Sequence, residues 1–303
     1  MWQNYKIRHI ILWGGITVKR FKKGDIVGRK SYNKDVIFEI TNIIKLNKKE
    51  KVFILKGITH RIEADCEESD LEIIDKRIVS QRVKKIDDEI IERIQKYLKH
   101  KSEDRILEVF NTGKERGIKK IYTGRILHLD GDRKYSEKSM KYYKSLGLNA
   151  IVKNIPEYKQ PKVVIDLLNR YNPDVLVITG HDGMIKKESN FNDIYNYRNS
   201  RYFMNTVNMA RKWNSPKANG LAIFAGACQS FYEAIMSAGA NFASSPKRIM
   251  IDFIDPLVVA QKIATTENTK YLSINDIENE LRDGRDGIDG VGTIGKKYVK
   301  IEV

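Results

Sequence analysis

The spacing of hydrophobic and polar residues changes twice along the chain and so divides it into three segments. In residues 20–75, short apolar runs at 26–27, 36–40 and 52–55 alternate with polar connectors. Runs of this length at nearly regular spacing are typical of short strands joined by turns. We therefore expect residues 20–75 to form a small β-barrel.

Residues 76–120 have the period of an amphipathic helix. Apolar residues recur every three or four positions, with charged residues between them, at Val79, Val83, Ile86, Ile90, Ile94 and Tyr97. This spacing puts them on one face of a helix, and Gly113 and Gly117 mark its expected end. The segment is predicted to be a helical linker whose apolar stripe is covered by a neighbouring part of the protein.

From residue 121 to residue 303, predicted strands alternate with predicted helices. The strands are 126–129, 150–152, 175–179 and 221–225, and the helices are 135–146, 162–171, 198–213 and 231–238. Apolar strands separated by helices indicate a parallel sheet that is covered on both faces. We also expect one helix after Pro256, and a loop with a hairpin in the glycine-rich stretch 284–295.

Composition narrows the class of protein. Two cysteines are too few for a disulfide framework and suit a reducing compartment. No window of about twenty apolar residues is present, so no membrane span is expected. The net charge of +16 is concentrated in residues 1–120, but no arginine-rich or aromatic-stacking pattern accompanies it, and nucleic acid is not an expected partner. A basic protein that binds nucleic acid or a surface, with an inactive α/β domain, stays an alternative.

The first residues are interpreted as a mis-called N-terminal extension, residues 1–19. Trp13-Gly14-Gly15 is what a purine-rich ribosome-binding sequence would encode if it were translated. Val18 would then be the true start, through a GTG codon.

Polar residues gather where the predicted strands end. Ligands bind beyond the carboxyl ends of the strands in an open parallel sheet. Strand 126–129 is followed by Asp130 and Asp132, strand 175–179 by His181, and strand 221–225 by Cys228. Ser244 and Ser245 follow a further segment near 240 and are expected to contribute to substrate binding.

Cys228 and His181 have the positions that nucleophilic catalysis needs. Cys228 follows a glycine and precedes a predicted helix, whose N-terminus favours a thiolate and can hold an oxyanion. His181 ends the preceding strand and can act as the base. A buried structural cysteine, and a histidine bonded to a carboxylate, are the alternatives. We expect the N–H groups of Cys228, Asp182 and Gly183 to supply the oxyanion hole.

Longer motifs resemble known peptidases. A strand ending in histidine, followed about 50 residues later by a strand ending in Ala-Cys, resembles the caspase-like clan. Those enzymes usually read His-Gly, whereas Asp182 here intervenes before Gly183. The chain is more closely similar to the YabG family of sporulation-specific proteases over roughly residues 20–300. This resemblance is carried by the motifs at 27–32, 128–132, 173–182, 224–230 and 238–246.

The resemblance implies an α/β fold with a parallel-sheet, caspase-like peptidase domain at 121–303. The β-barrel and the helical linker that the residue spacing predicts at 20–75 and 76–120 would precede it, and the short strands of the barrel suggest an SH3-like fold. It also implies a cysteine endopeptidase (a thiol protease) with a thioacyl intermediate and no cofactor. Its substrates would be spore coat and cortex-associated proteins, cleaved in the mother-cell cytoplasm of a sporulating bacterium and at the spore coat. Another hydrolase with the same Cys-His dyad is the remaining alternative.

The expected specificity is cleavage after arginine and, less well, after lysine. A caspase-like sheet places the end of its first strand beside the pocket for the residue that precedes the scissile bond, and this strand ends at Asp130. A buried carboxylate can bond a guanidinium through both oxygens. Asp132 is the alternative pocket residue. A metal site with His128 and a structural role as a helix cap were weighed for these aspartates, and no metal is expected, because no second cluster supplies further ligands.

Overall fold

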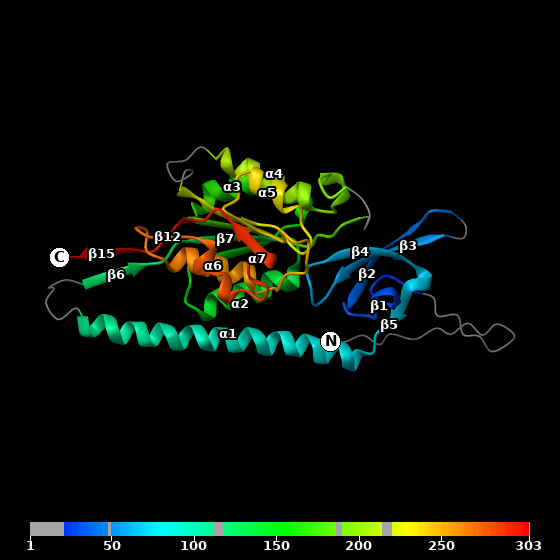
Figure 1. The fold of residues 1–303 in the computed structure, drawn as a ribbon, viewed down its shortest axis with the longest axis horizontal. Coiled ribbons are helices and arrows are strands. Elements are labelled where there is room, and N and C mark those ends of the chain that lie inside the picture. Colours follow the sequence, from blue (N-terminus) through cyan, green and yellow to red (C-terminus); the bar gives the residue numbers. More distant parts are fainter. Residues whose placement is uncertain (1–20, 48–49, 112–117, 186–189, 214–219, 303) are drawn as a thin grey trace.

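The computed structural model describes residues 21–47, 50–111, 118–185, 190–213 and 220–302. Figure 1 shows a five-stranded sheet at one end, a larger α/β unit beside it, and one long helix running along the outside of that unit. The proposed N-terminal extension at 1–19 and the expected helix end at Gly113 and Gly117 lie outside the described residues.

The N-terminal sheet is antiparallel, with strand order β4-β3-β2-β1-β5. Its strands are β1 (Ile26–Arg29), β2 (Phe38–Lys45), β3 (Lys51–Gly57), β4 (Glu63–Glu67) and β5 (Leu71–Ile73). The three predicted strands fall on β1, β2 and β3, whereas β4 and β5 are too polar and too short for an apolar run to reveal them. Val27, Ile40, Phe53 and Leu55 form the centre of its apolar core.

Helix α1 (Lys76–Asn111) continues the chain from this sheet along the α/β unit (Figure 1). Ile86, Ile90 and Ile94 pack against the core of the α/β unit, so a neighbouring part of the protein covers this portion of the predicted stripe. Ile78, Ile91 and Leu98 lie away from that contact and are exposed.

The central sheet has six strands in the order β13-β11-β10-β9-β7-β8. They are β7 (Ile126–Asp130), β8 (Ala150–Asn154), β9 (Val175–Thr179), β10 (Ala222–Ala225), β11 (Phe242–Ser244) and the antiparallel edge strand β13 (Ile288–Gly290). The other five pair in parallel, so the protein is a mixed α/β fold with a largely parallel sheet. The strand order reverses between β7 and β9, and such a switch point is where open sheets bind ligands.

Helices cover both faces of this sheet. Alternate residues of β9 point to opposite sides: Val175 and Val177 join one core cluster, and Leu176 and Ile178 join the other. The first face carries α2 (Arg133–Ser145) and α6 (Asp255–Thr265), and the second carries α3 (Gln160–Tyr171), α4 (Ser200–Arg211) and α5 (Tyr232–Ser237). Helices α2, α3, α4 and α5 match the predicted ones within a few residues at each end, and α6 is the helix expected near Pro256.

The C-terminal region departs from the prediction. The glycine-rich stretch forms the short helix α7 (Gly284–Gly287), then β13 and β14 (Thr293–Ile294), but these two strands do not pair as a hairpin. β13 pairs with β11, and β14 pairs with β12 (Tyr271–Leu272). The pair β6 (Ile118–Tyr122) and β15 (Tyr298–Glu302) was also not predicted. The hairpin was wrong because pairing partners far apart in sequence leave no local signal.

Short 3₁₀ turns connect several elements: η1 (Lys30–Tyr32), η2 (Glu68–Asp70), η3 (Glu157–Lys159), η4 (Ile194–Asn196), η6 (Ile274–Asp276) and η7 (Glu278–Glu280). Among the described residues, no helix is long and apolar enough to cross a membrane.

Candidate active site at the carboxyl edge of the central sheet

His181 and Cys228 occupy equivalent positions on neighbouring strands. β9 and β10 pair in parallel with Ile178 opposite Ala225, and each candidate residue follows three positions later. Both side chains are fully buried. The strand register therefore brings the imidazole and the thiol to the same edge of the sheet, although no hydrogen bond between them is found in the described part of the chain.

The imidazole of His181 has one engaged nitrogen and one free nitrogen. Its Nε2 lies 3.1 Å from the carbonyl oxygen of Gly57, and a carbonyl can only accept, so Nε2 carries the proton. Its buried Nδ1 has no hydrogen-bond partner among the described residues. The ring of Tyr135 packs edge-on against the imidazole, with centroids 5.6 Å apart. This arrangement leaves the Nδ1 lone pair available to accept a proton.

Burial keeps both groups neutral in this conformation. Loss of solvent, together with the nearby Lys56 ammonium, lowers the pKa of His181 to about 4, against an opposing effect of Asp132. Burial raises the pKa of the Cys228 thiol to about 11. The Cys228 Sγ lies 3.8 Å from the carbonyl oxygen of Ile251. At neutral pH the pair is therefore a thiol and a neutral imidazole.

Asp182 ties the histidine turn to the cysteine turn. Its Oδ1 accepts the N–H of Gly183 at 2.9 Å and of Asn199 at 2.8 Å. Its Oδ2 accepts the hydroxyls of Ser200 at 2.5 Å and of Ser230 at 2.9 Å. Burial raises the pKa of Asp182 to about 6, although all four hydrogen bonds favour the carboxylate. The residue that replaces the glycine of the usual His-Gly pair is thus a brace between the two candidate catalytic turns.

The three expected oxyanion donors have different surroundings. The N–H of Asp182 donates to the carbonyl oxygen of Arg61 at 3.2 Å. The N–H of Gly183 is engaged by the Asp182 carboxylate. The N–H of Cys228 has no hydrogen-bond partner among the described residues. The Asp182 N–H is thus already bonded to a peptide carbonyl oxygen, the Gly183 N–H to a carboxylate, and the Cys228 N–H is the unengaged one of these three donors.

Asp130 is fully buried and lies against the guanidinium of Arg61, and we call the surroundings of this pair the arginine pocket. The Nη2 of Arg61 is 2.8 Å from the Asp130 Oδ2, and both side chains are almost fully buried. The contact is an ion pair, without the angles of a good hydrogen bond. The guanidinium also lies over the rings of Tyr135, at 5.0 Å, and of Phe253, at 5.1 Å. The pocket offers one carboxylate and two aromatic faces, a combination that suits a guanidinium.

A buried hydrogen-bond chain holds that carboxylate. The Tyr143 hydroxyl lies 3.2 Å from the Nδ1 of His128, whose Nε2 lies 2.7 Å from the Thr179 hydroxyl. Thr179 in turn donates to the Asp130 Oδ2 at 2.8 Å. Burial holds the pKa of His128 well below its usual value. Both ring nitrogens are thus engaged, and the described residues include no cluster of side chains suited to a metal ion.

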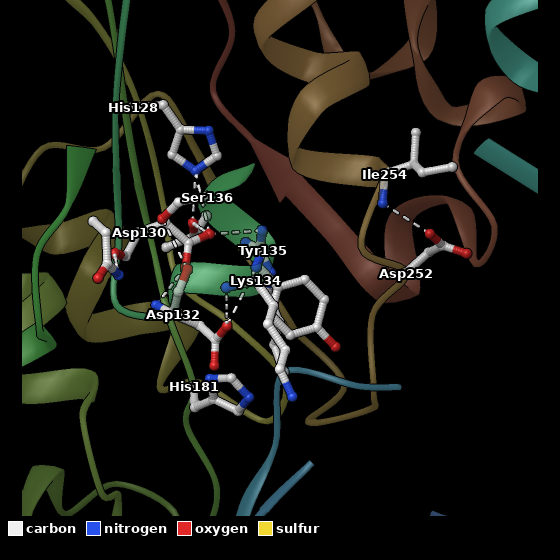
Figure 2. Close-up of polar contacts among 12 residues, drawn as sticks. His128, Asp130, Asp132, Lys134, Tyr135, Ser136, His181, Asp252 and Ile254 are labelled. Atoms are coloured by element: carbon white, nitrogen blue, oxygen red, sulfur yellow. Dashed lines mark hydrogen bonds and ion pairs between the residues drawn. The ribbon is translucent and has the colours of Figure 1, made fainter. Parts of the chain in front are cut away.

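Asp132 begins helix α2 and does not enter the arginine pocket. Its carboxylate accepts the N–H groups of Lys134 at 2.8 Å and of Tyr135 at 3.2 Å, as an N-cap does. It also lies 3.4 Å from the Lys56 ammonium. Figure 2 shows this cap beside the His181 ring, with Asp130 further up the same loop. The Arg133 side chain is exposed and pairs with Glu137, so it does not neutralise the pocket.

Ser244 and Ser245 support the loop that carries Cys228. The Ser245 hydroxyl accepts the N–H of Gln229 at 3.1 Å and donates to the carbonyl of Ile249 at 2.8 Å. Ser244 is fully buried, and its hydroxyl has no partner among the described residues. It lies close behind Gly226, where an added Cβ would be 3.2 Å from the Ser244 side chain.

The connector between β3 and β4 packs against helix α2 and the His181–Gly183 turn. Ile58 accepts a hydrogen bond from the Tyr135 hydroxyl at 3.0 Å. Ile62 pairs with Asp182 as an isolated parallel bridge, and the N–H of Glu63 donates to the Asp182 carbonyl at 2.7 Å. At Gly183 an added Cβ would lie 2.2 Å from the Glu63 carbonyl oxygen. A glycine is therefore required at position 183 so that the Glu63 backbone can approach it closely.

Sequence reasoning missed Arg61 and Glu157. Arg61 lies in a polar connector with no distinguishing signal, since only the fold carries it into the pocket. Glu157 accepts the N–H of His181 at 2.8 Å, and an added Cβ at Gly131 or Gly180 would strike its carboxyl group. It follows β8, so the rule that ligands bind at strand ends could have identified it if it had been applied to the strand predicted at 150–152.

Comparison with known proteins identifies the family of the chain. No solved structure matches the chain significantly. The sporulation-specific protease YabG of Bacillus subtilis (strain 168) is 36% identical to it over 266 residues, which cover 85% of this chain and 90% of that protein. The family model described as YabG peptidase U57 matches residues 22–301. The chain therefore belongs to the YabG family of peptidases and is a protease of the hydrolase class.

Proposed function

We propose that the protein is a cysteine endopeptidase that cleaves after arginine and, less well, after lysine, with Cys228 as the nucleophile and His181 as the base. The observation that supports this most directly is the arrangement around Arg61. Its guanidinium pairs with Asp130, and its carbonyl oxygen accepts the Asp182 N–H. One arginine residue thus contacts the pocket and an oxyanion donor at the same time.

The reaction follows from the two turns. The Cys228 thiol gives its proton to the His181 Nδ1 as the sulfur attacks the carbonyl carbon of the substrate arginine. The N–H groups of Asp182 and Cys228 hold the developing oxyanion. The C–N bond then breaks, the leaving amine takes the proton from the imidazole, and a water molecule hydrolyses the thioester.

The neutral state of the Cys228 thiol and the His181 imidazole is consistent with this order of steps. Burial lowers the pKa of His181 and raises that of Cys228. The thiolate–imidazolium pair therefore does not exist before the substrate binds. Proton transfer would accompany attack on the carbonyl carbon. The Nε2–H···O=C bond to Gly57 fixes the tautomer that this step needs.

The family supports a wider proposal about biology and architecture. The curated relative is named a sporulation-specific protease. We extend this to cleavage of spore coat and cortex-associated proteins, in the mother cell and at the spore coat. We also propose that residues 20–75 are an SH3-like unit and residues 121–303 a caspase-like unit, with residues 76–120 as the linker between them.

A set of fluorogenic peptides that differ only in the residue before the scissile bond tests the specificity. We expect arginine peptides to be cleaved fastest, lysine peptides more slowly and aspartate peptides not measurably. Asp130→Ala should lower kcat/KM for arginine peptides about a hundredfold or more, because a buried charge partner is lost. Asp132→Ala is the matched control and should keep the preference. Equal turnover of arginine and aspartate peptides, or an arginine preference that survives Asp130→Ala, would contradict the proposal.

A further inference from the structure

A cavity of about 460 Å³ lies at the amino ends of strands β10 and β11, at the opposite edge of the central sheet from the candidate active site. Its wall includes Leu221 and Asn241, which directly precede these two strands, and Thr293 and Lys296 from the C-terminal region. Small-molecule sites usually have volumes of about 300–1,000 Å³. The cavity is therefore large enough for a small ligand and is separate from the candidate catalytic residues.

Arg211, the last residue of helix α4, is the first of two cations in this wall. Its Nε donates to the carbonyl oxygen of Gly239 at 2.9 Å, its Nη1 to the carbonyl oxygen of Leu221 at 2.7 Å, and its Nη2 to the Asn241 Oδ1 at 2.8 Å. A guanidinium has five N–H donors. One N–H on each terminal nitrogen therefore has no acceptor in the described part of the chain, and two such donors can bond two oxygens of one anion.

The position of this guanidinium is fixed, but its charge is not balanced locally. The Asn241 Oδ1 that it binds also accepts the N–H of Ile223 at 2.8 Å, and the Asn241 Nδ2 donates to the carbonyl oxygen of Gly292 at 2.9 Å. Arg211 forms no ion pair with an acidic side chain among the described residues, and the sequence of residues 214–219, next along the chain, contains no acidic residue. Loss of solvent lowers the pKa of Arg211.

Lys296 is the second cation. Its backbone N–H donates to the carbonyl oxygen of Ile263 at 2.9 Å, and its stem packs where an added Cβ at Gly124 would lie 2.5 Å from the Lys296 Cβ. Its ammonium forms no hydrogen bond or ion pair with the residues that the structure describes. Loss of solvent lowers the pKa of Lys296; the charge of Asp174 opposes this shift, and the charge of Arg211 adds to it. Two partly buried cations thus repel each other across one cavity.

We propose that this cavity binds a phosphate group, either free or as part of a small molecule, with Arg211 and Lys296 as its charged partners. A phosphate group carries close to two negative charges at neutral pH, which matches the two cations. Its oxygens can accept both unengaged N–H groups of the guanidinium. The Thr293 hydroxyl is a further donor, since its bond to the Ile294 carbonyl oxygen is long, at 3.4 Å. The site does not depend on the proposed function of Cys228.

A purely structural role explains only part of this arrangement. An arginine that ties together the amino ends of two strands accounts for the bonds to Gly239 and Leu221. It does not account for Lys296, a second cation in the same wall whose ammonium has no bonded acidic partner among the described residues. Like charges that have lost solvent destabilise each other, and buried charges in proteins are paired or hold a ligand. A bound phosphate group supplies the negative charge that these residues do not.

Calorimetric titration of the full-length chain with inorganic phosphate and with glycerol 3-phosphate, at constant ionic strength with chloride as the balancing anion, tests the proposal. We expect saturable binding at one site and a higher unfolding temperature in phosphate than in chloride, because the ligand binds only the folded form. Cys228→Ala should bind as wild type does. The ratio of the two Kd values shows whether the free ion or an ester is preferred, and either preference supports a phosphate site. No heat of binding and equal unfolding temperatures in the two salts would overturn it.

Variants of neighbouring lysines locate the site. Lys296→Gln should raise the Kd for phosphate about tenfold or more, because a hydrogen bond to a charged group is lost. Lys296→Arg should restore binding to within about threefold of wild type, since the charge is kept. Lys297→Gln is the matched control: Lys297 pairs with Glu267 at 3.8 Å, and its loss should leave the Kd unchanged. Unfolding curves without phosphate check that each variant folds. Wild-type affinity in Lys296→Gln, or tighter binding of the dicarboxylate malonate than of either phosphate probe, would overturn the assignment.

Discussion

The protein contains two buried cysteines and two buried histidines associated with strands, and of these Cys228 and His181 follow neighbouring strands at the carboxyl edge of the central sheet. Cys66 and Cys228 are both buried, and burial raises the pKa of each to about 11. Burial likewise lowers the pKa of both His128 and His181. Residue type, exposure and the direction of the pKa shift therefore fail to distinguish the candidate site from the core.

The contacts do distinguish them. Cys66 lies within strand β4, opposite Phe53, whereas Cys228 follows strand β10 at the carboxyl edge of the central sheet. Both ring nitrogens of His128 are used in hydrogen bonds, whereas the Nδ1 of His181 has no partner in the described part of the chain. The His181 Nε2 also lies 3.1 Å from the carbonyl oxygen of Gly57, at the end of β3. The candidate site is therefore distinguished by a buried imidazole whose Nε2 is bonded to a backbone carbonyl and whose Nδ1 has no hydrogen-bond partner among the described residues.

The largest expected effect separates the two cysteines. Cys228→Ala should lower kcat on an arginine peptide by more than about a thousandfold, because the nucleophile is lost. Cys66→Ala should leave kcat unchanged and lower the free energy of unfolding by about 1 kcal/mol, since it only trims the core of the N-terminal sheet. Steady-state kinetics and thermal unfolding of the two purified variants measure this. Loss of activity in Cys66→Ala but not in Cys228→Ala would show that Cys66, and not Cys228, is the nucleophile.

The difference in kcat between variants of the two histidines should be smaller than that between the two cysteine variants. His181→Ala removes a general base and should reduce kcat between about a hundredfold and ten-thousandfold. His128→Asn should keep kcat within about tenfold and raise KM for arginine peptides, because Thr179 and Asp130 lose part of their support. Similar kcat values for the two variants would show that His181 is not the base.

Glu157 offers a test of how the His181 turn is held. Burial raises its pKa from 4.5 to about 7, so the folded protein keeps a proton that the unfolded chain has released between these pH values. This contribution to stability is present at low pH and is lost as the pH rises through the window. With about 1.4 kcal/mol per pKa unit, the loss is at most roughly 3.5 kcal/mol. Denaturant unfolding of wild type and Glu157→Gln at pH 5 and pH 8 measures it.

The expected outcome is a stability gap that changes with pH. Glu157→Gln has no proton to lose, so its stability relative to wild type should improve between pH 5 and pH 8. A gap that is the same at both pH values would show that Glu157 is already ionised in the fold at pH 5.

The smallest expected effect concerns Asp132. Asp132→Ala removes the N-cap of α2 and should cost about 1 kcal/mol of the free energy of unfolding. Asp132→Asn retains a good cap and should cost less than half of that. Both should keep the arginine preference, since the pocket carboxylate is Asp130. Equal losses of stability in the two variants would show that the charge, and not the cap, is what matters.

Much of the α/β unit could be predicted from the sequence, because β7, β9 and β10 are short apolar runs between helices with clear periods. The same strand ends identified Asp130, His181 and Cys228, since topology alone brings them to one edge. The inward position of Arg61 and the pairing of β13 with β11 could not be predicted in this way. Both depend on contacts between segments that are distant in sequence, and local spacing carries no record of such contacts.

The most direct measurement is to treat the full-length chain with an arginine-based acyloxymethyl ketone and to locate the adduct by peptide mass spectrometry. The probe requires a reactive thiol and an arginine pocket at the same site. The account predicts one adduct, on Cys228, that forms much more slowly with an aspartate-based probe and is lost in Asp130→Ala. An adduct on Cys66, or equal labelling by the arginine and aspartate probes, would contradict it.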